Sequence, residues 1–163
     1  MEFPKSPSLH YDGACADILI TGIQGHPLGR KFRALVCHDG IFNNANLLST
    51  EELYFPFHDL GGLPWYSPSN STPFATSSTS AWRRWDPSEH LSEWATPQLV
   101  IHNSKDYRLP ISEGLATFNV LQARGIDSQF LTFPDENHWV LKPENSLVWW
   151  VKPLVPLPKK HIS

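Results

Sequence analysis

The sequence predicts an α/β fold in which helices cover a parallel sheet, and three observations carry this prediction. Short apolar runs alternate with helical segments in the order strand, helix, strand, helix, strand, helix. The apolar runs are nearly continuous, as in strands that are buried on both faces. Polar residues follow the runs at their carboxyl ends, where the loops of a parallel sheet gather. A layered α/β sandwich with right-handed crossovers is therefore expected.

The first half of the chain contains one predicted strand and one predicted helix. The strand lies in residues 32–40 (FRALVCHDG), an apolar run closed by Asp and Gly as in a tight turn. A helix is expected to begin at Ser49, because residues 49–52 (STEE) have the form of a capping box. Residues 61–80 are rich in Gly, Pro, Ser and Thr and lack periodicity, which predicts a loop insert. Its sequon at Asn70 has meaning only if the chain is secreted.

The second half predicts two more strands and two more helices. Residues 96–106 (TPQLVIHNSKD) form an apolar strand that ends in polar residues, and residues 128–133 (SQFLTF) suit a mostly buried strand. Between them, residues 109–125 predict a helix with Pro near its start and Gly at its stop. Its expected apolar face consists of Ile111, Leu115, Phe118 and Leu121. A last helix should begin near Pro143 and run until Pro153 stops it.

Composition and charge limit the possible functions. The chain has 163 residues, of which 40% are hydrophobic and 18% charged, enough for one domain with its own core. Because the formal net charge is -3 and Lys and Arg form no long cluster, neither nucleic acid nor a membrane is an expected partner. No segment resembles a signal peptide or a membrane span. No cofactor is expected, and the spacing of Cys15 and Cys37 matches no metal motif, so no metal is expected either.

Two polar residues follow successive predicted strands. Asp106 comes just after the second strand, and His138, in the stretch PDENHW, comes after the third. The order Asp then His is the closing half of the α/β-hydrolase triad, whose chain order is nucleophile, acid, histidine. In such a triad the carboxylate orients the imidazole, and the imidazole takes the proton of a serine hydroxyl. Spacing alone leaves open the alternative that both residues are solvated or capping residues.

Residues 102–149 (HNSKDYRLPISEG to ENSLVW) resemble the carboxyl end of the catalytic domain in the prolyl oligopeptidase family of serine peptidases, and within it the fungal dipeptidyl peptidases. Residues 23–40, 49–55 and 83–88 resemble further blocks of the same family in the same order. The resemblance implies an incomplete α/β-hydrolase fold over residues 23–151, with the later half of a parallel sheet and flanking helices. It also implies that Asp106 is the triad acid and His138 the triad base. Peptides would be the substrates of the complete, secreted enzyme.

The nucleophile of this family stands in a segment like G-A-S-Y-G-G, and residues 1–22 diverge from it. Counting back without gaps places the serine near Ala14, and the sequence contains no G-x-S-x-G pattern. Cys15 is a poor substitute, because the two-glycine turn that presents the nucleophile is not in place. The expectation is therefore a C-terminal fragment of a serine-type dipeptidyl peptidase that is inactive as written, with its localisation unknown.

Alternatives to the peptidase interpretation stay open. A half-sheet of about three strands would expose an edge and an apolar face, which predicts marginal stability or a partner that covers the open edge. The chain could then be a non-catalytic relic that binds peptides or proteins. Metal-dependent hydrolysis by pairs such as His38-Asp39 and His58-Asp59 ranks last, because these pairs lack ligand spacing and are expected to be turn and surface residues. Residues 152–163 are expected to form a Pro- and Lys-rich tail.

Overall fold

The computed structural model describes residues 9–11, 16–50, 60, 62 and 78–152 of the chain. It contains one sheet of four parallel strands in the order β1-β2-β3-β4. The strands are β1 (Leu9–Tyr11), β2 (Leu35–His38), β3 (Gln98–Ile101) and β4 (Ser128–Leu131). The predicted α/β class and parallel sheet are thus confirmed, and strands β2 to β4 lie inside the three predicted ranges.

The fourth strand, β1, was not predicted. It pairs with β2 in parallel, with Leu9 opposite Leu35. A run of three residues is too short to show the alternation on which a strand prediction rests. Residues 1–22, the segment expected to diverge from the family, therefore include a strand of the sheet.

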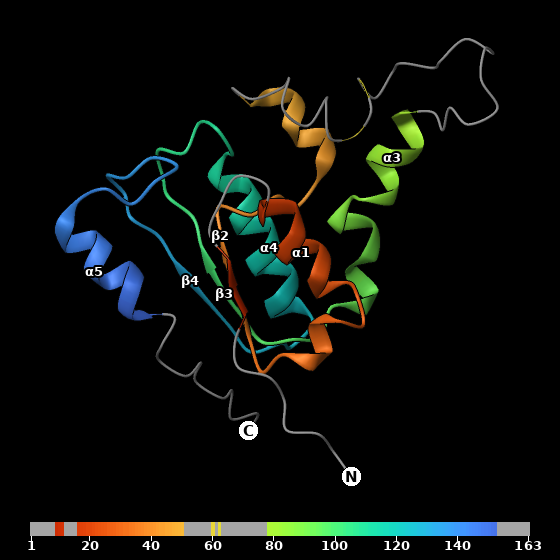
Figure 1. The fold of residues 1–163 in the computed structure, drawn as a ribbon, viewed down its shortest axis with the longest axis horizontal. Coiled ribbons are helices and arrows are strands. Elements are labelled where there is room, and N and C mark those ends of the chain that lie inside the picture. The colour runs from red at the N-terminus through yellow and green to blue at the C-terminus, as the bar shows by residue number, and fades with distance from the viewer. Residues whose placement is uncertain (1–8, 12–15, 51–59, 61, 63–77, 153–163) are drawn as a thin grey trace.

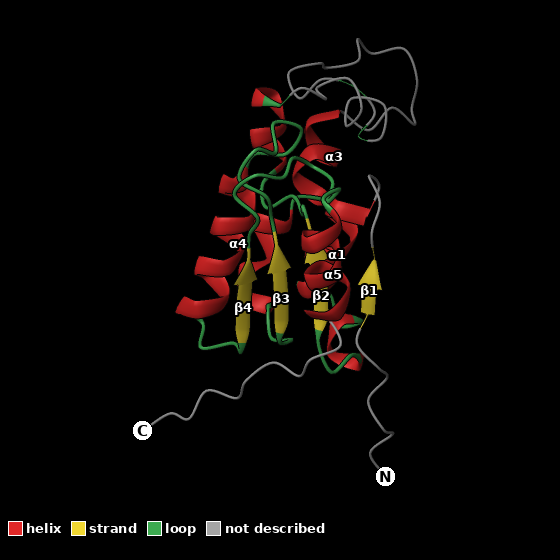
Figure 2. Ribbon diagram, turned by 90° about the vertical axis from the view of Figure 1, so that its left-hand side faces the viewer, coloured by secondary structure: helices red, strands yellow, loops and turns green. Residues whose placement is uncertain are grey.

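The described residues contain four α-helices: α1 (Ala16–Gln24), α3 (Ser78–Arg84), α4 (Ile111–Ala123) and α5 (Pro143–Val151). Short 3-10 helices cover Gly29–Lys31, Asn44–Ser49 and Pro87–Glu93. Figure 1 and Figure 2 show α5 on one face of the sheet and α1 with α4 on the other. None of the described helices is both long and apolar enough to cross a membrane.

The two predicted helices α4 and α5 are confirmed. The helix predicted from Ser49 and the loop predicted at residues 61–80 differ from the structure where it describes them. The expected start of a helix at Ser49 is wrong, because Ser49 ends a 3-10 helix and Thr50, its C-cap, has an extended backbone. The rest of that predicted helix lies outside the described residues. Most of the expected insert at residues 61–80 also lies outside them. Its last three residues are helical, because α3 begins at Ser78.

Side chains of the strands alternate between the two faces of the sheet. Leu35 and Cys37 of β2 pack with Ile20 and Ile23 of α1 on one face. On the opposite face Val36 packs with a cluster that contains Leu99, Ile101 and Trp149. This burial on both faces explains why the strands appear as continuous apolar runs in the sequence.

The apolar face predicted for α4 is confirmed only in part. Leu121 is buried, Ile111 and Phe118 are half-buried, and Leu115 is exposed. The buried residues of α4 also include Glu113, Gly114 and Thr117, which were not predicted. The small residues let the helix approach β3 closely, and the buried carboxylate of Glu113 binds the backbone of the loop after β2. Hydrophobic periodicity does not register either reason for burial.

Candidate active site

Three loops that follow strands β2, β3 and β4 meet at the carboxyl ends of these strands. The strand ends are level, because His38 pairs with Ile101 and Ile101 with Leu131. Asp39 directly follows β2, Asp106 lies in the loop after β3, and His138 lies in the loop after β4. The structure thus brings the two predicted site residues together and adds Asp39 to them.

Asp106 and His138 form the central pair of this site. Nδ1 of His138 lies 2.9 Å from Oδ2 of Asp106. The other oxygen of Asp106 accepts hydrogen bonds from the backbone N–H groups of Arg108 (3.0 Å) and Leu109 (2.8 Å). The carboxylate is fully buried, whereas the His138 side chain keeps 11% of its surface exposed. A buried acid held by two N–H groups is well placed to orient the imidazole.

The loop that carries His138 is held by buried polar groups. Asn103 donates from Nδ2 to the backbone oxygen of Asn137 at 2.7 Å, which connects the loop after β3 to that after β4. The buried carboxylate of Glu136 accepts hydrogen bonds from the N–H groups of Leu141 and Lys142 and from Nδ2 of Asn145. Burial acts to raise the pKa of Glu136, but these hydrogen bonds outweigh it and lower the pKa below its usual value.

His102 lies behind the central pair and was not predicted as a site residue. Its side chain is fully buried, with Nε2 2.7 Å from the backbone oxygen of Leu109 and 3.6 Å from Oδ2 of Asp106. Gly114 of α4 lies directly against its ring. His102 therefore packs Asp106 and its loop against α4. No spacing rule separates such a histidine from any other residue at a strand end.

Asp39 is a further acidic group beside His138. Its Oδ2 lies 3.5 Å from Nδ1 of His138 and 3.0 Å from Nε2 of His38. Asp39 has a positive φ of 52°, which few residues other than glycine adopt. Burial raises the pKa of Asp39, and the hydrogen bond and charge of His38 offset this only in part. The expectation that His38 and Asp39 are surface residues is wrong, because both are buried; His58 and Asp59 lie outside the described residues.

Glu113 of α4 fixes the loop that follows Asp39. Its Oε2 accepts hydrogen bonds from the N–H groups of Phe42 (2.9 Å) and Asn43 (3.0 Å), and its Oε1 from Nδ2 of Asn46 (2.6 Å). The side chain is buried. A buried carboxylate with three donors holds the backbone after β2 in one position relative to α4.

The expected nucleophile region lies in the connection between β1 and α1. Strand β1 ends at Tyr11 and α1 begins at Ala16. Ala14 and Cys15 therefore fall between a strand and a helix, although both lie outside the described residues. This strand-to-helix order around residues 12–15 is the order that surrounds the nucleophile of an α/β-hydrolase.

Comparisons with known proteins agree with these features. Dipeptidyl-peptidase 5 of Schizosaccharomyces pombe is 58% identical over 132 residues, which are 80% of this chain and 18% of that protein. Dipeptidyl-peptidase 5 of Aspergillus fumigatus is 56% identical over 133 residues, 80% of this chain and 17% of that protein. The chain thus spans less than a fifth of the length of these relatives.

Solved structures show the same fold. An acylaminoacyl peptidase in complex with Z-Gly-Gly-Phe-chloromethyl ketone matches 96% of this chain and 24% of its own with a TM-score of 0.62 at 16% identity. The acylaminoacyl peptidase of Pyrococcus horikoshii matches 81% of this chain and 19% of its own with a TM-score of 0.58 at 17% identity. The fold is therefore part of an α/β-hydrolase fold. The sequence profile of the prolyl oligopeptidase family matches residues 19–161, so the chain belongs to the prolyl oligopeptidase family.

Proposed function

We propose that the chain carries the acid and the base of a serine-type dipeptidyl peptidase, Asp106 and His138, within part of the catalytic domain. The observation that carries the proposal is the 2.9 Å contact between Nδ1 of His138 and the buried carboxylate of Asp106. The similarity to two dipeptidyl peptidases supports the substrate class, which is peptides with a free amino-terminus.

The chemistry follows from the contacts of the pair. With Nδ1 donating its proton to Asp106, the imidazole adopts the tautomer in which Nε2 carries a lone pair. Nε2 can then accept the proton of a hydroxyl, and the carboxylate stabilises the imidazolium that forms. The backbone N–H groups of Arg108 and Leu109 keep Asp106 in place during this step. These groups supply general-base catalysis but no nucleophile.

The proposal includes inactivity of this chain by itself. Residues 12–16 read DGACA at the position of the nucleophile turn, and no G-x-S-x-G occurs in the 163 residues. A base without a hydroxyl to activate cannot form an acyl-enzyme. Cys15 is not assigned as a nucleophile, because the two-glycine turn is incomplete.

A fluorophosphonate serine-hydrolase probe tests this proposal, with an amino-terminal dipeptide amide as the substrate in a parallel assay. The purified, folded chain is expected to show neither labelling nor turnover. Labelling that disappears in His138→Ala but persists in His90→Ala would overturn the inactivity, because it would require a serine or Cys15 activated by His138. His90 is a suitable control because it is exposed and lies against Gly25, just after the end of α1.

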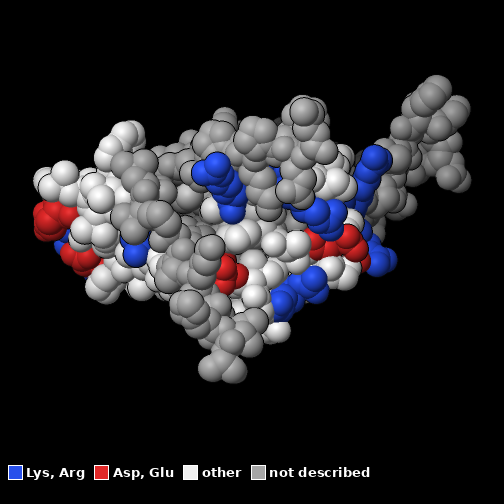
Figure 3. All heavy atoms as spheres, turned by 90° about the horizontal axis from the view of Figure 1, so that it is seen from below, with Lys and Arg blue, Asp and Glu red and all other residues white. Residues whose placement is uncertain are grey.

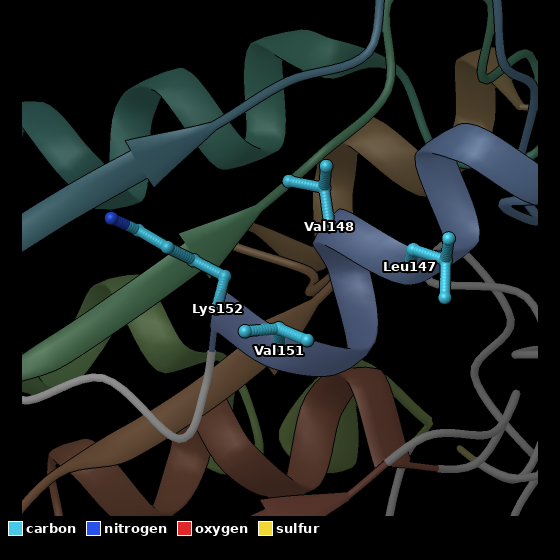
Figure 4. A pocket seen from close by; sticks show the side chains of 4 residues that line it. All are labelled: Leu147, Val148, Val151 and Lys152. Atoms are coloured by element: carbon cyan, nitrogen blue, oxygen red, sulfur yellow. The ribbon is translucent and has the colours of Figure 1, made fainter.

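A second candidate function is binding of a protein or peptide by a non-catalytic hydrolase relic. The observation that favours it is the apolar outer side of α5, where Leu147, Val148 and Val151 are 69%, 47% and 53% exposed. Figure 4 shows these three side chains and Lys152 lining one hollow along the helix. Sedimentation of the chain with an intact dipeptidyl peptidase relative tests this function, with Leu147→Asp as the variant expected to abolish a complex.

On the face shown in Figure 3, the described charged residues form no binding surface comparable to the apolar side of α5. On the face shown in Figure 3, the Lys and Arg side chains lie among Asp and Glu side chains. Among the described residues, Arg30 also lies 3.0 Å from Glu93, and Arg83 lies 3.5 Å from Glu89, so these positive charges each have a negative neighbour. The described residues on this face therefore form no extended basic patch of the kind that binds nucleic acid.

A further inference from the structure

Three side chains at the edge of the sheet form a set of potential metal ligands. Asp39, Asp106 and His138 each offer one ligand atom, and the three atoms all lie within 4.8 Å of one another. Nδ1 of His138 is 2.9 Å from Oδ2 of Asp106 and 3.5 Å from Oδ2 of Asp39. Ligand atoms that surround one tetrahedral metal ion at about 2.0–2.2 Å stand about 3.3–3.6 Å apart. The separation of Nδ1 from Asp39 lies in that range, and the shorter separation from Asp106 would have to widen when an ion replaces the proton between the two atoms.

Asp39 provides an independent reason to expect a ligand here. Only 3% of its side-chain surface is exposed, and its Oδ2 faces Nδ1 of His138. The second oxygen, Oδ1, is buried without a hydrogen-bond partner. A buried carboxylate oxygen without a partner costs free energy, and a cation bound by both oxygens of Asp39 would give Oδ1 the partner that it lacks.

We propose that Asp39, Asp106 and His138 bind one divalent transition-metal ion of the Zn²⁺ type. One imidazole nitrogen and two carboxylate oxygens suit Zn²⁺, whereas Mg²⁺ and Ca²⁺ prefer sites made of oxygen ligands only. With three protein ligands, a fourth position remains for water, as in open zinc sites. The loops after β2, β3 and β4 each supply one ligand, so the ion would also tie the three loops together.

Metal binding excludes the role of His138 as a base. An ion on Nδ1 replaces the proton that His138 donates to Asp106. The remaining ring proton of the neutral imidazole then stays on Nε2, which can no longer accept a proton from a hydroxyl. In a chain with a nucleophile, the ion would therefore inhibit catalysis. Binding itself does not depend on the proposed function, because it requires only the three side chains.

The test is a titration of the purified, folded chain with Co²⁺, followed by its visible absorption, with Zn²⁺ as the competitor. We expect one equivalent of Co²⁺ to bind and Zn²⁺ to displace it. Asp39→Asn and His138→Ala should each weaken the apparent affinity by about tenfold or more. Asn tolerates the positive φ at position 39, so Asp39→Asn keeps the backbone and the side-chain volume. His90→Ala, which removes an exposed histidine away from the site, should bind like the original chain.

Two results overturn the proposal. One is absence of a stoichiometric cobalt spectrum in the folded chain, and the other is an affinity that Asp39→Asn leaves unchanged or that His90→Ala abolishes. A thermal shift gives a second readout, because an ion that binds only the folded chain raises Tm. Excess Zn²⁺ should raise Tm of the original chain and of His90→Ala, but not of Asp39→Asn. These measurements are separate from probe labelling, so failure of the metal site and failure of the proposed function remain distinguishable.

Discussion

Replacement of Gly114 by alanine tests the packing behind the Asp106–His138 pair. An added Cβ at position 114 would lie 2.6 Å from Cβ of His102 and 2.8 Å from both Cγ and Nδ1, whereas ordinary contacts begin at 3.4 Å. His102 cannot easily move away, because it is fully buried and its Nε2 lies 2.7 Å from the backbone oxygen of Leu109. The added methyl group therefore has to displace α4 from β3 or the ring of His102 from its place.

The magnitude follows from two opposing effects. Overpacking a tight contact costs about 1–3 kcal/mol, while alanine in a helix interior is favoured over glycine by about 1 kcal/mol. We expect Gly114→Ala to lower the free energy of unfolding by up to about 2 kcal/mol, which lowers Tm by up to several degrees in a domain of this size. Displacement of His102 should also change the NMR signals of His138, because His102 contacts the same carboxylate of Asp106.

Gly22→Ala is the matched control for this measurement. Gly22 lies in α1, and a Cβ added there meets no atom within 4 Å. Only the helix propensity then changes, so Gly22→Ala should raise the free energy of unfolding by up to about 1 kcal/mol. Urea unfolding of both variants gives the comparison. Equal stabilisation by both substitutions would refute the close contact between α4 and His102.

Two further predictions concern the buried acids. Glu113→Gln should lower the free energy of unfolding by about 1–3 kcal/mol, because an amide cannot accept all three hydrogen bonds that the carboxylate now accepts. Urea titration measures this change. The exposed control Glu89→Gln should change the free energy of unfolding by less than about 0.5 kcal/mol. Because the pKa of Asp39 is raised in the folded chain from 3.8, ionisation of this residue destabilises the fold as pH rises above 3.8. Asp39→Asn should therefore gain stability relative to the original chain between acid and neutral pH, and a constant difference in unfolding free energy across this range would contradict the prediction.

The sequence was sufficient for those parts of the fold that depend on local pattern. Strands β2 to β4 are apolar runs, and α4 and α5 carry Pro near their starts, so their positions could be predicted. Strand β1 was not predicted, because three residues are too few to show an alternating pattern. Helix α3 was not predicted, because it begins inside a stretch whose composition is typical of a loop. The buried face of α4 was predicted only in part, because Glu113 and Gly114 are buried for hydrogen bonding and for close approach, not for hydrophobicity.

The candidate site could be predicted only in part, for a related reason. Asp106 and His138 follow strands, and their order along the chain matches a known catalytic order, so both have a signal in the sequence. Asp39 also follows a strand, but it stands between His38 and Gly40, and an Asp-Gly pair after a strand is typical of a turn. The positions of Asp39 and His102 beside the pair depend on the register of three strands, which no local pattern encodes.

A segment exchange tests the central claim most directly, namely that Asp106 and His138 can serve as the acid and the base of a peptidase. Residues 19–152 of this chain would replace the matching part of Dipeptidyl-peptidase 5 from Schizosaccharomyces pombe, which supplies its own nucleophile turn. The chimera is expected to retain dipeptidyl-peptidase activity and to lose it by about 10³–10⁴-fold in Asp106→Asn and in His138→Gln, but not in His90→Gln. A folded chimera that keeps its activity in Asp106→Asn or His138→Gln would contradict the claim.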